Sequence, residues 1–267
     1  MIFSYDKIQD QLPEMLKQRV FLECPLFDNM SHIRLSFALI IEKLNVQSKW
    51  RPYLDILPEK FRTVLYFTPT EMKELHGTMA FSTALKQVKF IAAQYAFLYK
   101  YLMVAIENHP LVEELRNNFT YEFYRWAVSV IMTRQNIIPQ EDGSRDSVLI
   151  PLWDMANHIN GTINTQYNDE TQQIESFCLN NFDAGQHVTM AYGNRSNLDF
   201  LIHNGFVYAQ NENKDLSIKL SLSKSDELFE ERVKLLQQLG LPPTGNFQIS
   251  PAFSNELIAF VRVFNMS

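Results

Sequence analysis

Apolar residues recur at helical spacing through much of the first half of the chain. From Ser31 onward the apolar positions are Ile33, Phe37, Ile40, Ile41 and Leu44. Residues three and four apart lie on one face of a helix, so this spacing predicts a helix with a single buried stripe. Residues 1–130 as a whole are predicted to be mainly helical.

Two further helices have recognisable starts. Thr68 precedes Pro69, and Glu71 follows at the position from which its carboxylate can reach back to the backbone of the capping residue. This is the pattern of a capping box with proline in the first turn. Thr120 predicts a second start, at which Phe119 and Tyr124 are spaced to pack on each other. That second helix carries Arg134 and Asn136 at its C-terminal end, where Asn136 could also be a simple helix cap.

The period changes after Pro139, and short strands replace helices. A polar turn at 168–170 predicts a hairpin between two of them, and Asp183-Ala184-Gly185 predicts a turn into another. The last strand alternates apolar and polar residues, as a half-buried strand does. The predicted strands are Val148–Ile150, Thr162–Tyr167, Gln173–Leu179, Val188–Tyr192 and Asp215–Leu222.

A separate helical module is predicted at the C-terminal end. Ser225 is the expected cap of a helix whose first turn holds Asp226 and Glu227, and Gly240 with two prolines closes it. A final helix has an apolar stripe that requires partners. Its members are Leu257, Phe260, Val261 and Phe264.

Composition excludes several functional classes. The 267 residues are 46% hydrophobic with a formal charge of −6, and they contain no cluster of Lys and Arg. Nucleic-acid affinity depends on such clusters, so we expect no nucleic-acid partner. No apolar stretch is long enough to span a bilayer and no secretion signal opens the sequence, so no membrane partner is expected, and the expected compartment is the cytoplasm or the nucleus. Cys24 and Cys178 are too few for a zinc site, and we expect both to be buried and no metal to be bound.

Two short segments carry the strongest functional signal. They are Trp153-Asp154-Met155-Ala156-Asn157-His158 and, downstream, Tyr192-Gly193-Asn194-Arg195-Ser196-Asn197. In this order and spacing they resemble the C-terminal half of a SET methyltransferase. Met132-Thr133-Arg134-Gln135-Asn136, followed by Glu141-Asp142-Gly143-Ser144-Arg145, resembles the SET subfamily that methylates a histidine of actin. The layout is similar to the Rubisco large-subunit methyltransferase type.

The resemblance implies an α+β fold, namely a SET-domain β-fold with a large helical insertion, followed by the start of an α-helical substrate-binding domain. The implied segments are a partial N-terminal SET segment (1–30), the helical insertion (31–135), the C-terminal SET core (136–210) and the substrate-binding domain (211–267). The eight glycines contain no Gly-x-Gly pair of the kind that opens such domains. The chain therefore resembles a fragment or short isoform, with weak or no cofactor binding expected of it alone.

The implied cofactor is S-adenosylmethionine. By resemblance, Arg134 would bind the carboxylate of this cofactor, for which a planar guanidinium is suited. The alternative is that Arg134 is an ordinary surface arginine. The remaining implied cofactor-binding residues form two runs, which elsewhere are often ordinary turns. They are Asp154, Met155, Ala156, Asn157 and His158, and then Asn204, Gly205 and Phe206. His203 is interpreted as a core residue.

The resemblance implies Tyr192 and Asn136 as the catalytic residues, with Trp153, Arg195 and Asn136 contacting the substrate. Methyl transfer requires a neutral nucleophilic nitrogen aligned with the methyl carbon, and no strong acid or base. An imidazole with a pKa of about 6.5 is mostly neutral in the cell, whereas lysine, near 10.4, must first lose a proton. The short amide of Asn136 could hydrogen-bond the non-reacting ring nitrogen of a histidine.

Three functions remain open at the level of sequence. The first is a monomeric enzyme, a protein-histidine N-methyltransferase that acts on actin. The second is a lysine methyltransferase with a non-histone substrate, which the same fold would support. The third is a non-catalytic isoform that binds an actin-like peptide.

Overall fold

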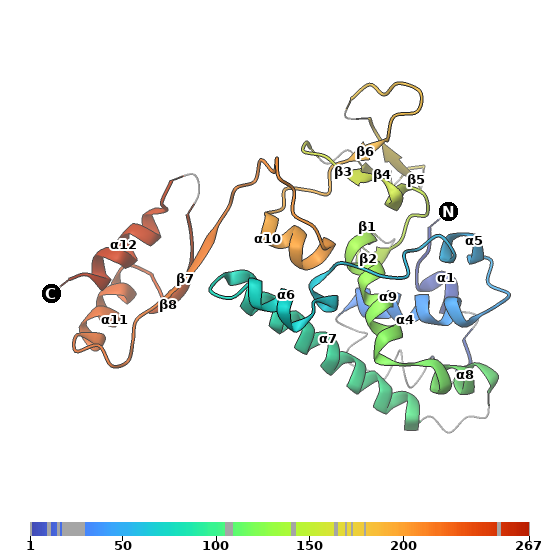
Figure 1. Ribbon diagram of the computed structural model, residues 1–267, viewed down its shortest axis with the longest axis horizontal. Coiled ribbons are helices and arrows are strands. Elements are labelled where there is room, and N and C mark those ends of the chain that lie inside the picture. The colour runs from blue at the N-terminus through green and yellow to red at the C-terminus, as the bar shows by residue number, and fades with distance from the viewer. Residues whose placement is uncertain are drawn as a thin grey trace.

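A computed structural model describes residues 2–9, 12–14, 17, 30–104, 109–139, 143–162, 165–168, 170–171, 173–178, 180–249 and 252–266. Most of the predicted N-terminal segment (1–30) therefore lies outside the described residues. Cys24, Glu141 and Asp142 also lie outside them. Helices occupy the first half of the chain, short strands follow, and a small C-terminal unit stands at the left of Figure 1.

The main hydrophobic core forms where α4 (Ser31–Leu44) packs on α9 (Tyr121–Arg134). Ile33, Phe37, Ile40 and Ile41 are all buried on α4, as their helical spacing predicts. The long helix α7 (Met79–Val104) runs beside this pair (Figure 1). The other helical elements of this part are α1 (Asp6–Gln9), α5 (Arg51–Leu54), the 3₁₀ turn η2 (Val64–Tyr66), α6 (Pro69–Glu74) and α8 (Pro110–Asn118).

The predicted helix starts are confirmed. Thr68 and Glu71 form the reciprocal bonds of a capping box before α6, and the Thr120 hydroxyl accepts from the Phe123 N–H before α9. The rings of Phe119 and Tyr124 lie 5.8 Å apart, edge to face. Helix α9 therefore begins at a defined residue, and its far end enters the site at a defined position.

Within the described residues, four small two-stranded sheets follow α9. The antiparallel pairs are β1 (Asn136–Pro139) with β2 (Arg145–Val148), β4 (Thr165–Asn168) with β5 (Gln173–Ser176), and β7 (Ser217–Ser221) with β8 (Thr244–Gln248). β3 (Asn157–His158) pairs in parallel with β6 (Thr189–Met190). The β4–β5 hairpin is confirmed, whereas the strand predicted at Val148–Ile150 begins earlier, at Arg145, and only its first residue belongs to β2.

Asn136 is not the cap of α9. Gln135 occupies that position in an extended conformation, and its N–H bonds to the Ile131 carbonyl. Asn136 begins β1 and pairs with Val148. The chain thus leaves the helix one residue before Asn136, and the pleat of the strand sets the direction of the Asn136 side chain.

The C-terminal unit packs α11 (Phe229–Gln238) and α12 (Asn255–Phe264) on the antiparallel pair of β7 and β8, between which α11 lies in the chain. The predicted cap at Ser225 is wrong, because α11 begins at Phe229 and Glu230 and Glu231 are the acids of its first turn. Asp226 instead accepts from the Leu228 N–H and pairs with Arg232, which keeps residues 223–228 in turns.

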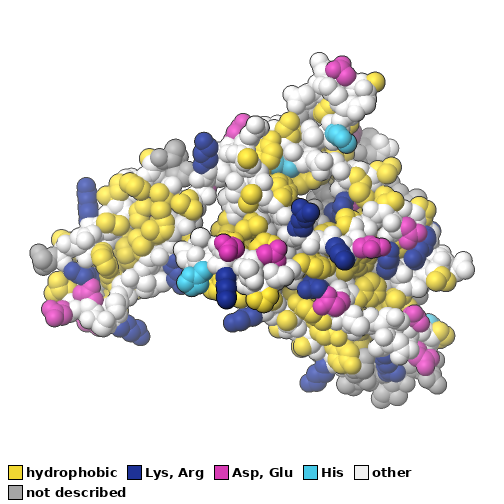
Figure 2. All heavy atoms as spheres, in the orientation of Figure 1, with side chains coloured by type: hydrophobic (Ala, Val, Ile, Leu, Met, Phe, Trp, Pro, Cys, Tyr) yellow, Lys and Arg dark blue, Asp and Glu magenta, His cyan; other side chains and the backbone are white. Residues whose placement is uncertain are grey.

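The predicted stripe of α12 is partly wrong. Leu257, Phe260 and Val263 are buried, whereas Val261 and Phe264 are 41% and 47% exposed. The helix is rotated so that its inner face follows the spacing 257–260–263 instead. Apolar side chains gather over this left-hand unit in Figure 2.

Candidate active site

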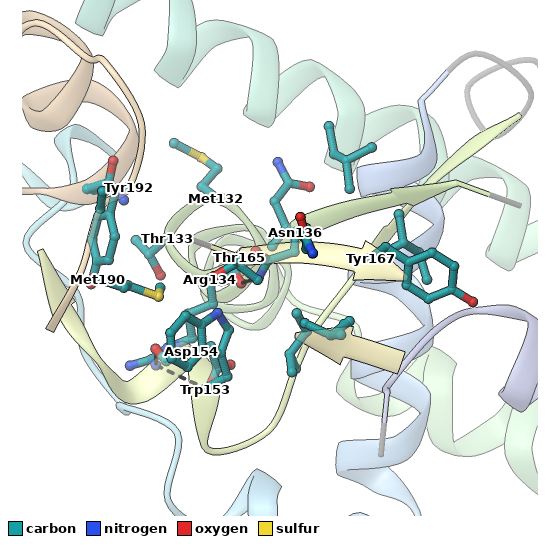
Figure 3. A pocket seen from close by; sticks show the side chains of 18 of the residues that line it. Met132, Thr133, Arg134, Asn136, Trp153, Asp154, Thr165, Tyr167, Met190 and Tyr192 are labelled. Atoms are coloured by element: carbon teal, nitrogen blue, oxygen red, sulfur yellow. Dashed lines mark hydrogen bonds and ion pairs between the residues drawn. The ribbon is translucent and has the colours of Figure 1, made fainter. Parts of the chain in front are cut away.

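A cavity of about 340 Å³ opens where the end of α9 meets β1, the β4–β5 hairpin and the segment after β6. Figure 3 shows Tyr192 and Met190 on one side, Tyr167 on the other, and Arg134 near Asp154 and Trp153. Predicted site residues from four separate segments therefore meet at one cavity. Those that line it are Arg134, Asn136, Trp153, Asp154, Tyr192, Arg195 and Asn204.

Arg134 is held against the turn that carries Trp153 and Asp154, the 3₁₀ turn η3 (Trp153–Met155). Its Nη1 donates to the backbone oxygen of Asp154 at 2.7 Å and to Met155 Sδ at 3.3 Å. The same nitrogen lies 3.9 Å from the Asp154 carboxylate, whose side chain is fully buried. These contacts account for one nitrogen of the guanidinium, and Nε is buried without a hydrogen-bond partner among the described residues.

Several buried polar atoms around this cavity have no hydrogen bond among the described residues. Besides Arg134 Nε they include Gln135 Oε1, Trp153 Nε1 and Asp154 Oδ1. Leaving a buried polar group unsatisfied costs about 1–3 kcal/mol, and such groups in native proteins usually serve a ligand or a water molecule. The cavity therefore has unused donors and acceptors of the kind a polar ligand requires.

Asn136 brings a second amide group into the cavity. Its Nδ2 donates to the Arg134 carbonyl oxygen at 3.3 Å, so the acceptor Oδ1 is the atom that could take an N–H from a ligand. The neighbouring cavity walls come from Ile138 and from Thr165, Tyr167 and Ile174 of the β4–β5 hairpin.

Tyr192 is fixed at both ends. Its phenol donates to the Ala156 carbonyl at 2.7 Å, and its backbone N–H donates to His158 Nδ1 at 3.2 Å. Burial raises the pKa of the phenol, which the charge of Arg134 partly offsets. Tyr192 is therefore a neutral, immobilised phenol at neutral pH, suited to presenting a ring face and unsuited to removing a proton.

His158 belongs to an aromatic cluster beside the cavity. Its ring lies 5.2 Å from Tyr192, 4.7 Å from Phe200 and 5.0 Å from Tyr208, and Phe206 stacks on Phe200 at 4.9 Å. Burial lowers the His158 pKa, so the ring is neutral and can accept the Tyr192 N–H.

Six of the predicted cofactor residues do not line the cavity. They are Met155, Ala156, Asn157, His158, Gly205 and Phe206. Ala156 and His158 hold Tyr192 instead, and Asn157 is exposed. Whether these residues also hold a cofactor stays a prediction.

Gly205 is placed by a backbone constraint. It ends the π-helix η4 (Phe200–Asn204) at φ +78°, and a β-carbon there would lie 2.7 Å from the backbone carbon of Arg62. Asn204, the preceding residue, accepts from Arg195 Nη1 at 3.0 Å. Arg195 is further anchored by its carbonyl, to which Asn211 Nδ2 donates at 2.9 Å. The segments around Arg195 and Asn204, which lie before and after α10 (Asn197–Asp199), are thus joined by hydrogen bonds into one wall.

Two expectations about single residues are wrong. His203 lies in η4 with its side chain exposed, so it is not a core histidine. Cys178 is exposed just beyond β5, where the strand has ended and no core covers it.

Thr133, the residues of the β4–β5 hairpin that line the cavity, and Tyr53 were not predicted as site residues from the sequence. Thr133 lies between Met132 and Arg134, so its place within the motif could have identified it. The hairpin was predicted, but nothing in its alternation indicates which sheet face meets α9. Tyr53 donates its hydroxyl to Asp154 Oδ2 from 101 residues away, a separation that no local pattern can detect.

In the described part of the chain, no three His, Cys, Asp or Glu side chains gather as a metal site would require. Likewise, none of the described helices combines the length and apolarity needed to cross a membrane.

Solved structures of Rubisco LSMT share this fold. A structure of Rubisco LSMT bound to AdoMet matches with a TM-score of 0.74 at 19% identity, covering 100% of this chain and 59% of that one. A SET domain of LSMT bound to lysine and AdoHcy also matches with a TM-score of 0.74, covering 98% and 59%. The model of the Rubisco LSMT substrate-binding family matches residues 223–267. The chain has the SET-domain fold of the Rubisco LSMT type, which confirms the predicted fold class.

The relatives in sequence are more specific. The chain is homologous to actin-histidine N-methyltransferases, being 45% identical over 244 residues to the protein of Dasypus novemcinctus and 44% identical to that of Homo sapiens. Each alignment covers 89% of this chain, and the chain spans about two fifths of the length of these relatives (41% and 40%).

Proposed function

We propose that the protein is an S-adenosylmethionine-dependent protein-histidine N-methyltransferase whose substrate is actin. The observation that carries the proposal is the meeting of Asn136, Trp153 and Tyr192 at one cavity, in a chain 45% identical to an actin-histidine N-methyltransferase. The SET-domain fold supports methyl transfer in general, and the identity of these three side chains supports histidine as the acceptor.

The polar atoms of the cavity fit the proposed cofactor. Arg134 has an unsatisfied Nε at the cavity wall, where a carboxylate could accept a charge-assisted bond. The predicted partners for the rest of the cofactor are Asp154–His158 and Asn204–Phe206. When bound, S-adenosylmethionine would supply a methyl group activated by the positive charge of its sulfur.

The chain's own residues orient the acceptor and need not move its proton before transfer. An imidazole is mostly neutral near pH 7, so its reacting nitrogen already carries a free electron pair. Asn136 Oδ1 would accept the N–H of the other ring nitrogen, which fixes the tautomer and turns the reacting nitrogen forward. The neutral phenol of Tyr192 and the indole of Trp153 would wall the ring, and aromatic faces also favour the positive charge that appears during transfer.

Lysine methylation is the second candidate. A specific observation favours it, since structural neighbours of the LSMT type hold lysine or methylated lysine as the bound acceptor. Asn136 argues against it, because its Oδ1 can accept the N–H of the second ring nitrogen of an imidazole, whereas an aliphatic amine has no second nitrogen to donate such a bond.

Mass spectrometry of actin-derived peptides tests the proposal. Two peptides that differ only by His or Lys at the target position are incubated with the protein and S-adenosylmethionine. We expect a single added methyl group on the histidine peptide and little on the lysine peptide. Transfer to lysine alone would establish the second candidate, and peptide binding without transfer would leave a non-catalytic binder.

A further inference from the structure

Behind the cavity, Tyr53 and Asp154 form a buried polar pair that neither the fold nor the motif accounts for. Tyr53 lies in α5 and is 6% exposed, and Asp154 is 5% exposed. The Tyr53 hydroxyl donates to Asp154 Oδ2. The main core thus sends a phenol to the rear of the cavity wall, where a phenylalanine would fill nearly the same volume.

The second carboxylate oxygen of Asp154 faces Arg134. Oδ1 lies 3.9 Å from Arg134 Nη1 and has no hydrogen bond of its own among the described residues. The Asp154 backbone oxygen binds the same Nη1 at 2.7 Å. Asp154 therefore holds the guanidinium by both its backbone and its charge, and Tyr53 holds Asp154.

The charge of Asp154 depends on few groups. Burial raises the Asp154 pKa, and the hydroxyl of Tyr53 and the charge of Arg134 oppose that rise. Tyr192 is the other titratable group that interacts with this carboxylate, and its own phenol is neutral because burial raises its pKa. A hydrogen bond from its own backbone N–H also lowers the Asp154 pKa, so removing the Tyr53 hydroxyl would remove one of three influences that keep the carboxylate ionised.

We propose that Tyr53 is a positioning residue of the site: its phenol holds the Asp154 carboxylate so that this carboxylate keeps the Arg134 guanidinium aimed at an anionic group of the bound ligand. The ligand part rests on the proposed function, in which that group is the carboxylate of the cofactor. The part that concerns Tyr53, Asp154 and Arg134 rests on the geometry of the chain itself.

Tyr124→Phe provides a matched control. Tyr124 is fully buried in α9, and its hydroxyl donates to Gln94 Oε1 at 3.1 Å, away from the cavity. Both Tyr53→Phe and Tyr124→Phe remove one buried phenol hydrogen bond without removing a ring. A difference between them therefore reports the partner, a carboxylate in one case and a neutral amide in the other.

The first experiment needs no ligand. Urea unfolding of the wild type, Tyr53→Phe, Asp154→Asn and the double variant is measured between pH 5 and pH 8. Because the Asp154 pKa is raised on folding and rises further without the phenol, the penalty of Tyr53→Phe should be largest at pH 8 and shrink on acidification. We expect the unfolding constant to rise about tenfold at pH 8 and by a clearly smaller factor at pH 5.

The stability penalty of Tyr53→Phe in the Asp154→Asn background should not change with pH. The penalty of Tyr124→Phe in the wild type should not change with pH either. A Tyr53→Phe penalty that is as large at pH 5 as at pH 8 would overturn the proposal, since an ordinary buried hydrogen bond would behave in that way.

The second experiment titrates S-adenosylhomocysteine into the same proteins by calorimetry at pH 8. Tyr53→Phe should lower the affinity about tenfold, and Tyr124→Phe should leave it within about twofold. Affinity unchanged by Tyr53→Phe would overturn the positioning of Arg134, even if the stability cycle shows coupling. A wild type that does not bind the probe would overturn the ligand part of the proposal and would agree with the weak cofactor binding expected of this chain alone. The stability cycle would still decide whether Tyr53 controls the charge of Asp154.

Discussion

The cavity and the aromatic cluster beside it differ in how many of their buried polar atoms lack hydrogen bonds. Around the cavity, Arg134 Nε, Trp153 Nε1 and Asp154 Oδ1 are buried and lack hydrogen bonds among the described residues. In the cluster, the His158 ring is enclosed by aromatic neighbours and its Nδ1 accepts the backbone N–H of Tyr192, while its Nε2 is buried without a hydrogen bond among the described residues. The cavity therefore holds several unsatisfied polar atoms, whereas the cluster consists mainly of packed rings.

This difference assigns separate tasks to the two regions. Unsatisfied groups held rigidly in a buried wall bind a ligand without reorganising, which is the condition for strong electrostatic stabilisation. The cluster stabilises the backbone from which Tyr192 projects, and ring pairs of this kind contribute about 0.5–1.5 kcal/mol each beyond their buried area. A change in the cluster should therefore act on stability first, whereas a change in the cavity should act on specificity first.

Gly205→Ala should have the largest effect, because it breaks the support of the cluster. The new β-carbon would lie 2.7 Å from the backbone of Arg62, at a φ of +78° that side chains rarely adopt. We expect a loss of about 3 kcal/mol or more in the free energy of unfolding, measured in urea. Gly193→Ala is the control, since its φ is +99° with open space around it, and it should cost about 1 kcal/mol. Equal costs for the two variants would mean that the close approach to Arg62 does not constrain this segment.

Asn136→Phe should change the acceptor preference of the cavity. It removes the amide proposed to bind the imidazole, an interaction of about 1–3 kcal/mol, or roughly tenfold to a hundredfold in rate. Histidine transfer should fall by that factor, and some lysine transfer should appear in the paired-peptide assay. An unchanged preference would show that Asn136 only bonds to Arg134 at the start of β1.

His158 should make the cluster sensitive to acid. Because its pKa is lowered by burial, the folded state holds the neutral ring, and that stability is lost as the pH falls below about 6.5. Protonation would also end the bond from the Tyr192 N–H, which is worth about 1 kcal/mol. The wild type should lose about this much more than His158→Phe between pH 7.5 and pH 5, with the background from other histidines, such as His32, cancelling in the difference. Parallel pH curves would contradict this.

Leu152→Gly should have the smallest effect, and a favourable one. Among the described residues Leu152 is the only non-glycine at positive φ (+73°), and its side chain is 78% exposed. Relief of strain of about 1–3 kcal/mol, less the entropy that glycine adds to the unfolded chain, predicts a net gain of up to about 1 kcal/mol. Thermal unfolding checks the sign, and a lower melting temperature would mean that the leucine side chain makes a stabilising contact.

Local chemistry in the sequence predicted the structure wherever neighbours along the chain decide it. Thr68 and Thr120 cap their helices because the groups that they satisfy lie three residues away. The same reasoning failed at Ser225, where Arg232 attracts Asp226 and the turn continues for another three residues. It also failed at Val261, since the inner face of α12 is chosen by its packing on α11 and β8.

The sequence predicted which residues form the site, but it did not predict how they contact one another. Resemblance identified Arg134, Asn136, Trp153 and Tyr192, and the cavity brings them together. His158 contacts a residue that is 34 positions away in the sequence, and Tyr53 contacts one that is 101 positions away. Tertiary packing creates such contacts without leaving a local pattern in the sequence.

The indole N–H signals in a proton–nitrogen NMR spectrum test the division of tasks most directly. Trp153 Nε1 is unbonded at the cavity, and Trp126 Nε1, which donates to the Pro58 carbonyl at 2.8 Å, is an internal control. On addition of the actin-derived histidine peptide together with S-adenosylhomocysteine, the Trp153 signal should shift and the Trp126 signal should stay in place. A Trp153 signal that does not move at saturating ligand would contradict the assignment of this cavity as the binding site.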